Sequence, residues 1–348
     1  MDSGFGRSLK QDWRSRCISV GALLAVIQPA QAQEEPFFKD KTIRVLVGSA
    51  AGGGYDAYAR VVSDHLRRHI PGNPQVVVQN MPGAGSLVAM NHIANVAPKD
   101  GTVIGAVNAA MTTLPMLKPE QAKFDPRKMN WLGSTLREFH IGLVRSNSPV
   151  KVLADAQKIE IPVAGTGGST ITYPLIANAV LKTKFKVVQG YPGTAQGMLA
   201  MERGEVDGVI GITWASIKAT QAAALRDGKF QVLAQFALRK HPELPNIPLA
   251  LDLAKTPDDQ AAMRLVFSSQ EVGRPWVAPE GVPAKTVAIL RKAFDDTMAD
   301  AEFRADAAKR KLDLEPTTGA EIQAVVDDIY KTPADVIERV KPYLGEAP

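Results

Sequence analysis

Glycine-rich segments at four places in the chain are the residues whose types and spacing best suit chemistry. They are AAGGGYD (50–56), MPGAGS (81–86), GTGGST (165–170) and GYPGT (190–194), and each lies at or near the end of a predicted strand. Glycine lets the backbone turn tightly and approach a ligand, and a helix that begins after such a turn adds partial positive charge. The pattern predicts capture of an anion.

Two nucleotide-binding patterns match the first of these loops only in part. A P-loop needs Lys followed by Ser or Thr after its last glycine, and the glycines of AAGGGYD are followed by neither. Gly52, Gly54 and Ala57 match a dinucleotide fingerprint in letters. The next predicted strand, however, ends in Gln79 and Asn80 instead of the acidic residue that binds a ribose. We therefore predict no cofactor.

A carboxylate or similar anion suits the first loop better. A helix is predicted over 56–70 from its apolar spacing, and Pro71 and Gly72 end it. Asp56 lies at the start of this helix. Because a carboxylate would repel an anionic ligand in direct contact, we expect Asp56 to cap the first-turn amides instead of touching the ligand.

The sequence carries no recognisable catalytic or metal-binding constellation. It has neither a G-x-S-x-G elbow nor an H-E-x-x-H motif. His65 and His69 are one helical turn apart, which is ligand spacing, but Arg67 and Arg68 lie between them and no third ligand is evident. We predict a solvated helix face there, no metal site and no catalytic residue.

The elements that must position these loops alternate between short Val- and Ile-rich runs and longer helical segments. This alternation predicts an α/β fold with mainly parallel strands, buried on both faces. Two long amphipathic helices are predicted near the C-terminus, over 283–300 and 318–340. The predicted strands cover 43–48, 75–79, 102–107, 161–165, 185–190, 207–212 and 231–236.

Composition and the first residues predict an exported chain of two domains. A basic segment, an apolar run and AQA at 30–32 form a secretory signal peptide over 1–32, with cleavage near Ala32. Cys17, the only cysteine, lies inside it, so the mature chain has no thiol. The mature net charge is about +3 and no basic block is present, which disfavours nucleic-acid binding. The length exceeds what one hydrophobic core usually serves.

Several segments in order resemble the Bug (TctC-like) family, the solute-binding proteins of tripartite tricarboxylate transporters. They include IRVLVGSAAGGGYDAYAR, VVVQNMPGAGSLVAMNHIANVAPKDGTVIG, PVAGTGGSTITY, GYPGTAQGMLAMERGEVDGVI and PWVAPEGVPAKTVAILRKAF. The resemblance implies a type II periplasmic binding protein, with a carboxylate ligand between two α/β lobes joined by two crossovers. The first lobe would take 34–137 and 260–348, and the second 138–259.

The resemblance also implies which residues bind the ligand, largely through backbone groups and waters of two opposed loops. In the first lobe these residues are Ala51, Gly52, Gly53, Gly54, Tyr55 and Asp56. In the second lobe they are Thr166, Gly168, Ser169, Thr170, Tyr191, Gly193 and Thr194.

Two departures from the family pattern bear on the ligand. No proline precedes the glycines at 52–54, and AVNAAMTT (106–113) lacks the family's common Thr-His pair. Asn108 could bind the ligand or serve as a turn amide. Trp214 could form the floor of the cleft or pack as an ordinary core side chain. Asp207 is expected to order the second-lobe loop or a crossover near the cleft.

These observations predict a binding module and not an enzyme: a monomeric periplasmic receptor that closes on a small organic carboxylate and delivers it to membrane permease subunits. A sensor that presents the ligand to a signalling system is the alternative among binding proteins. A hydrolase with an unfamiliar pattern is the alternative outside them. The sequence leaves the identity of the carboxylate open.

Overall fold

The computed structural model describes residues 36–344 except 53, 167 and 192. The described residues belong to one compact unit that begins at Pro36. The predicted signal peptide, residues 1–32, lies outside the described residues, as does Gly53.

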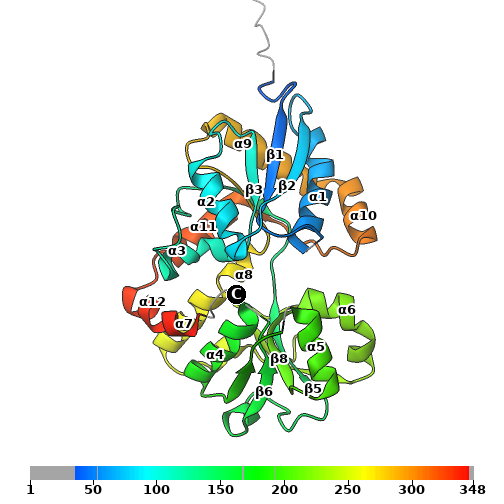
Figure 1. Ribbon diagram of the computed structural model, residues 1–348, viewed down its shortest axis with the longest axis vertical. Coiled ribbons are helices and arrows are strands. Elements are labelled where there is room, and N and C mark those ends of the chain that lie inside the picture. The colour runs from blue at the N-terminus through cyan, green and yellow to red at the C-terminus, as the bar shows by residue number, and fades with distance from the viewer. Residues whose placement is uncertain (1–35, 53, 167, 192, 345–348) are drawn as a thin grey trace, which may run out of the picture. The chain divides into compact units, whose positions relative to one another are not determined.

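The first of two sheets has, among the described residues, six strands in the order β11-β4-β10-β3-β1-β2 (Figure 1). Strand β1 pairs in parallel with β2 and β3, whereas β10 is antiparallel to β3 and β4, and β11 is antiparallel to β4. The strands are β1 (Thr42–Val47), β2 (Gln75–Asn80), β3 (Val103–Ala106), β4 (Asn130–Ser134), β10 (Pro275–Ala278) and β11 (Thr317–Thr318).

The second sheet has five strands within the described ranges, in the order β7-β6-β8-β5-β9. Strand β6 pairs in parallel with β7 and β8, and β5 is antiparallel to both β8 and β9. The strands are β5 (His140–Arg145), β6 (Ile161–Ala164), β7 (Phe185–Val188), β8 (Gly208–Thr213) and β9 (Phe230–Phe236).

Helices cover both faces of each sheet. In the first sheet, Val45 and Val47 of β1 face a core shared with α1, α9 and α10, while Leu46 between them faces a core shared with α2 and α11. The longer helices are α1 (Gly54–Leu66), α2 (Leu87–Asn95), α4 (Ser169–Leu181), α5 (Thr194–Arg203), α6 (Trp214–Arg226), α7 (Pro257–Phe267), α9 (Ala284–Ala299), α10 (Ala301–Lys309), α11 (Gly319–Ile329) and α12 (Ala334–Val340). Two short helices are α3 (Leu114–Leu117) and α8 (Ser269–Val272). Successive side chains of a strand point to opposite faces of the sheet. Because helices cover both faces, the side chains on both must be apolar.

All seven predicted strands are present, but the prediction of mainly parallel sheets is wrong. Each sheet is mixed because β4, β5, β9 and β10, next to the places where the chain passes between sheets, pair in antiparallel fashion. Strands β4 (NWLGS) and β10 (PWVA) carry Gly or Pro and lack a run of β-branched residues, so their sequences gave little strand signal.

Near the C-terminus one predicted helix is present and the other is broken. Helix α9 matches 283–300, whereas 318–340 forms α11 and α12 with a break before Pro333. A residue that precedes proline is disfavoured in helical conformation, which accounts for the break. Although the family resemblance places 260–348 in the first lobe, α7 and α12 pack into a core of the second sheet. The division into lobes itself stays a prediction.

We expect Asp300→Ala to lower the free energy of unfolding by about 1–2 kcal/mol, because Asp300 caps α10 and its other carboxylate oxygen pairs with Arg68 and His69. Its Oδ1 accepts hydrogen bonds from the amides of Glu302 at 2.8 Å and Phe303 at 3.3 Å. Urea denaturation would measure the loss. Asp296→Ala, which removes an exposed carboxylate that pairs with Lys292 of the same helix, is the matched control and should change stability by less than about 0.5 kcal/mol. Equal losses would contradict the capping role.

Candidate functional site

The hydroxyl of Ser86 joins the loops that follow β1, β2 and β3. It donates to the carbonyl oxygen of Gly48 at 2.9 Å and accepts from the amide of Asn108 at 3.0 Å, and Ser86 is only 2% exposed. A Cβ atom at Gly48 would lie 2.3 Å from this hydroxyl, so only glycine fits there. The sequence predicted no role for Ser86. A serine just before an apolar helix is typical of a helix cap, but the Ser86 side chain makes no cap hydrogen bond to α2 and bridges the loops instead.

Asp56 organises the first glycine loop from inside α1. Its Oδ2 accepts from the amide of Gly52 at 2.8 Å, and its Oδ1 accepts from the side chain of Asn80 at 2.9 Å. Asn80 also donates to the carbonyl oxygen of Ser49 at 3.0 Å. The guanidinium of Arg60 pairs with the same carboxylate and lowers the pKa of Asp56 to about 2. Asp56 was expected to accept hydrogen bonds from amides of the first helical turn. It instead accepts one from the amide of Gly52, which precedes the helix.

Among the remaining residues of the first loop, three are exposed, whereas the ring of Tyr55 is packed against other side chains. Ala51, Gly52 and Gly54 are exposed. Tyr55 turns away from them: its hydroxyl donates to the carbonyl oxygen of Gly273 at 3.4 Å, and its ring stacks on Arg274. The loop therefore offers backbone, and not the Tyr55 hydroxyl, to a ligand.

In the second sheet, the side chains of GTGGST hold their own loop. The amide of Thr166 donates to the hydroxyl of Thr170 at 2.8 Å, and the hydroxyl of Ser169 donates to the carbonyl oxygen of Gly211 at 2.8 Å. Gly211 has a φ of +89°, and a Cβ atom there would lie 2.4 Å from the carbonyl oxygen of Ser169. These contacts fix the start of α4, beside Gly168, against β8.

The loop after β7 leads directly into α5. Gly193 precedes the helix in extended conformation, and its carbonyl oxygen accepts from the amides of Gln196 and Gly197. Thr194 begins the helix, and Tyr191 packs against the core beneath it. The first-turn amides of a helix have no partner within the helix. Helices α1, α4 and α5 therefore each begin, with their positive ends, at a predicted binding loop.

Asn108 and Asp207 have structural roles. The Oδ1 atom of Asn108 accepts from the amide of Ala110 at 2.8 Å and caps a 3₁₀ turn, so this oxygen acts as a turn acceptor. Asp207 precedes β8 and pairs with Arg145, at the end of β5, at 2.8 Å. Asp207 therefore lies at the strand ends opposite to the glycine loops, so it does not order either of the second-lobe loops.

Trp214 lines a cavity of about 240 Å³ at the segments that connect the sheets. The indole nitrogen donates to Glu243 at 2.7 Å. The cavity wall also includes Tyr58, Glu138 and Arg274, whereas no described residue of the four glycine-rich segments contributes to it. Trp214 is thus a wall residue of this cavity, a role that neither sequence alternative described.

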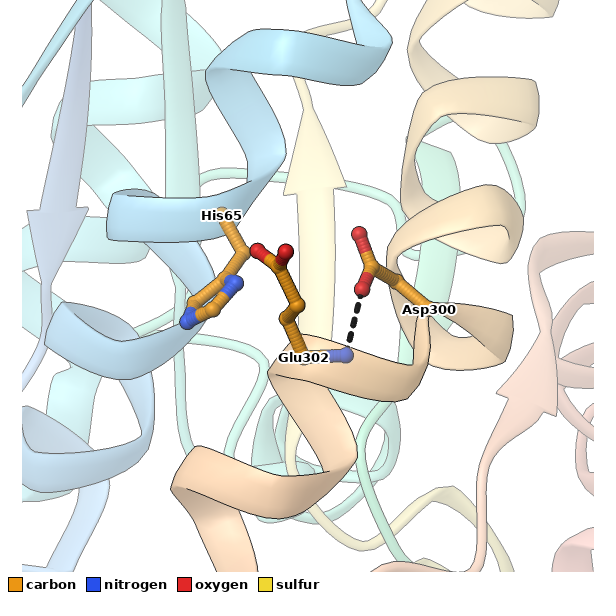
Figure 2. Close-up of side chains that lie close together, drawn as sticks. All are labelled: His65, Asp300 and Glu302. Carbon is orange, nitrogen blue, oxygen red and sulfur yellow. Dashed lines mark hydrogen bonds between the residues drawn. The ribbon is translucent and has the colours of Figure 1, made fainter.

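His65 is the nitrogen ligand of a candidate metal cluster that also contains Asp300 and Glu302 (Figure 2). Their ligand atoms lie within 4.8 Å of one another. The guanidinium of Arg68 lies among them, 2.6 Å from Nδ1 of His65, 2.9 Å from Asp300 and 2.5 Å from Glu302. Arg68 already supplies these ligand atoms with the positive charge that a metal ion would bring, so the cluster acts as ion pairs between the turn after α1 and the start of α10.

The prediction of a solvated face for the two histidines is wrong. Nε2 of His65 lies 3.3 Å from Asp306, and Nε2 of His69 lies 2.9 Å from Asp300. Both side chains are partly buried, because α10 packs across this turn.

Among the described residues, no helix combines the length and the apolar character that crossing a membrane requires.

We expect Ser86→Ala to lower the free energy of unfolding by about 1–3 kcal/mol, because it leaves a buried carbonyl oxygen and a buried amide without their shared partner. Thermal or urea unfolding would measure the loss. Ser49→Ala, which removes a hydroxyl whose contact is a 3.5 Å approach to the next residue, is the control and should be nearly neutral. A neutral effect of Ser86→Ala would contradict the bridging role.

Asp56 should make stability depend on pH in the acid range. Its pKa lies near 2 in the folded chain and at an ordinary value of 3.8 when unfolded, so its contribution is complete above pH 4 and is lost as the pH falls towards 2. Asp56→Asn should be less stable at pH 7 and should lose less stability between pH 4 and 2. Urea unfolding at several pH values tests this, with the exposed Asp64→Asn on the same helix as control. An unchanged slope would contradict the assignment.

Comparison with known proteins identifies the family. Residues 58–341 match the model of TctC, the tripartite tricarboxylate transporter family receptor. A Cupriavidus necator protein described as "UPF0065 protein in gbd 5'region" is 27% identical over 309 residues, which cover 86% of each chain.

Solved structures share the fold. A TctC solute-binding protein from Polaromonas, without ligand, has a TM-score of 0.66 at 17% identity and covers 86% of this chain and 98% of its own. MatC from Rhodopseudomonas palustris, with bound malate, has a TM-score of 0.57 at 21% identity, with coverage of 88% and 99%. Rpa4515 from R. palustris, with adipate, has a TM-score of 0.61 at 18% identity, with coverage of 88% and 98%.

The match over most of the chain and the shared mixed α/β architecture agree. The chain therefore belongs to the TctC family of tripartite tricarboxylate transporter receptors, which are periplasmic solute-binding proteins.

Proposed function

We propose that this chain captures a small dicarboxylate at the glycine loops and delivers it to the membrane permease subunits of a tripartite tricarboxylate transporter. The observation that carries the proposal is the start of α1, α4 and α5 at loops that follow β1, β6 and β7. Ligands of open α/β sheets bind at the carboxyl ends of strands, and helix N-termini favour anions there. The malate and adipate bound to the two R. palustris neighbours support the choice of ligand class.

The loop side chains support backbone recognition. Asp56 is neutralised by Arg60, and the hydroxyls of Ser86 and Ser169 donate to loop carbonyl oxygens, so none of these side chains competes for a ligand. The exposed backbone of Gly52 and Gly54 in one loop, and the half-buried backbone of Gly193 in another, would approach the two carboxylates. Binding and closure would then stabilise each other, because a ligand stabilises the state that it contacts most.

The proposal includes export and a binding role without chemistry. Residues 1–32 would direct the chain to the periplasm and be removed near Ala32. The first lobe would contain 34–137 and the second 138–259, with the C-terminal 260–348 assigned mainly to the first and α7 and α12 packed on the second. No bond would be made or broken in the ligand.

We expect the mature chain, freed of bound ligand by unfolding and refolding, to bind C4–C6 dicarboxylates. A ligand at about 100 times its Kd adds about 2.7 kcal/mol of stability, which raises Tm by several degrees. Thermal shifts and calorimetry with malate, succinate, adipate, citrate, aromatic acids and amino acids would rank the ligands. Turnover of test esters by the same preparation would favour a hydrolase, and an absence of any carboxylate-induced shift would contradict the proposal.

Gly193→Val should weaken dicarboxylate binding at least about tenfold and leave the fold intact. Gly193 has φ near −176°, which any residue adopts, and a Cβ atom there would meet only the flexible end of Gln196 at 3.3 Å. The added side chain would project at the start of α5, where we place a ligand carboxylate. Ala222→Val on the exposed side of α6 is the control. Unchanged affinity in Gly193→Val would contradict the role of this loop.

A further inference from the structure

Arg274 places a positive charge against the beginning of α1. It lies between α8 and β10, and its guanidinium carbon is 4.7 Å from the ring centre of Tyr55 and 4.6 Å from that of Tyr58. A Cβ atom on Gly54 would be only 3.0 Å from Nη1 of Arg274. Gly54 is the first residue of α1, so the guanidinium lies directly behind the end of the glycine loop.

This arrangement brings two positive charges together, that of the Arg274 guanidinium and the partial charge at the N-terminus of α1. A helix N-terminus carries partial positive charge, and a cation beside it is unfavourable unless an anion lies nearby. Stacking on two tyrosine rings holds the guanidinium in place, since aromatic faces attract cations. Its position therefore does not depend on a carboxylate partner.

The protein compensates the charge of Arg274 incompletely within the described residues. The carboxylate that pairs with it, Glu138, is 3.5 Å from Nη2, longer than a direct hydrogen bond. Nε and Nη1 of Arg274 are buried and have no hydrogen-bond partner among the residues that the structure describes. The charge of Asp56, in the first turn of α1, is compensated. Arg60, Asn80 and the amide of Gly52 all contact its carboxylate.

We propose that Arg274 is a positioning residue for ligand binding, whose charge behind the first turn of α1 strengthens capture of a dianionic ligand at the glycine loop, while Glu138 opposes it. The inference rests on the proposed function. It assigns the preference for dianions to a side chain outside the glycine loops. Glu138 and Arg274 both line the 240 Å³ cavity, where the charges of Arg137 and Lys218 are matched in number by those of Asp313 and Glu315.

The electrostatic role gives the two partners opposite effects, whereas a purely structural ion pair gives them the same effect. Arg274→Gln should weaken adipate binding at least about tenfold, and Glu138→Gln should tighten it several-fold. Arg274→Lys, which keeps the charge but not the planar stacking, should stay within about threefold of the unmodified chain. The effect of Arg274→Gln should be smaller for adipate monoamide, which carries one charge, and should shrink at high salt.

Calorimetric titration of the full mature chain with adipate and its monoamide, at two ionic strengths, tests these expectations. Urea unfolding of each variant identifies any that fail to fold, and Glu138→Gln and Arg274→Lys keep the test decisive if Arg274→Gln does not fold. Weaker binding in both Arg274→Gln and Glu138→Gln, equal for both ligands and independent of salt, would overturn the inference and leave the proposed function standing. If the unmodified chain bound no dicarboxylate, the proposed function would fail, and the inference with it.

Discussion

The buried hydroxyl of Ser86 is the contact on which the first set of loops depends. One oxygen atom donates to the carbonyl of Gly48 and accepts from the amide of Asn108, so the ends of β1 and β3 are held against the loop after β2. Buried backbone groups must find partners, and here a side chain provides them where the sheet hydrogen bonds stop. The close approach leaves no room for a Cβ atom at Gly48.

The second sheet meets the same constraint with different residues. Thr170 accepts from the amide of Thr166, and Ser169 donates to the carbonyl oxygen of Gly211 on the neighbouring strand. In both sheets, polar side chains stabilise the loop internally and leave exposed glycine backbone facing outward. The proposed binding loops would thus be organised before a ligand arrives, which would lower the entropic cost of binding.

Asp56 and Arg274, the two charged groups at the start of α1, differ in how well the protein compensates their charges. Asp56 is held by Arg60 and Asn80, and its low pKa expresses how well the protein satisfies it. Arg274 is fixed by ring stacking and has one distant carboxylate partner. The start of α1 thus carries a satisfied negative charge and a less satisfied positive one, and this imbalance favours an anion outside the loop. The cluster of His65, Arg68 and Asp300, between the end of α1 and the start of α10, differs because it contains its own cation, Arg68.

The sequence by itself determined the features that depend on local residue types. Val- and Ile-rich runs gave the seven predicted strands, and the glycine segments gave loops at their carboxyl ends, because backbone preference and side-chain period act over a few neighbouring residues. The resemblance in motif order named the family that the comparison confirmed. Strands β4 and β10, with Gly and Pro in short segments, had no such local signal.

Only the tertiary structure decided which polar groups are satisfied and by what. Three placements depend on sheet pairing: Asn80 beside Asp56, Ser86 between Gly48 and Asn108, and Asp207 at the strand ends away from the glycine loops. Arg274 stacks on Tyr55, and the two residues are far apart in the chain. The sequence around either residue therefore could not predict this contact. Local composition selects the conformation of a segment, whereas the free energy of a buried polar or charged group depends on the atoms that folding brings to it.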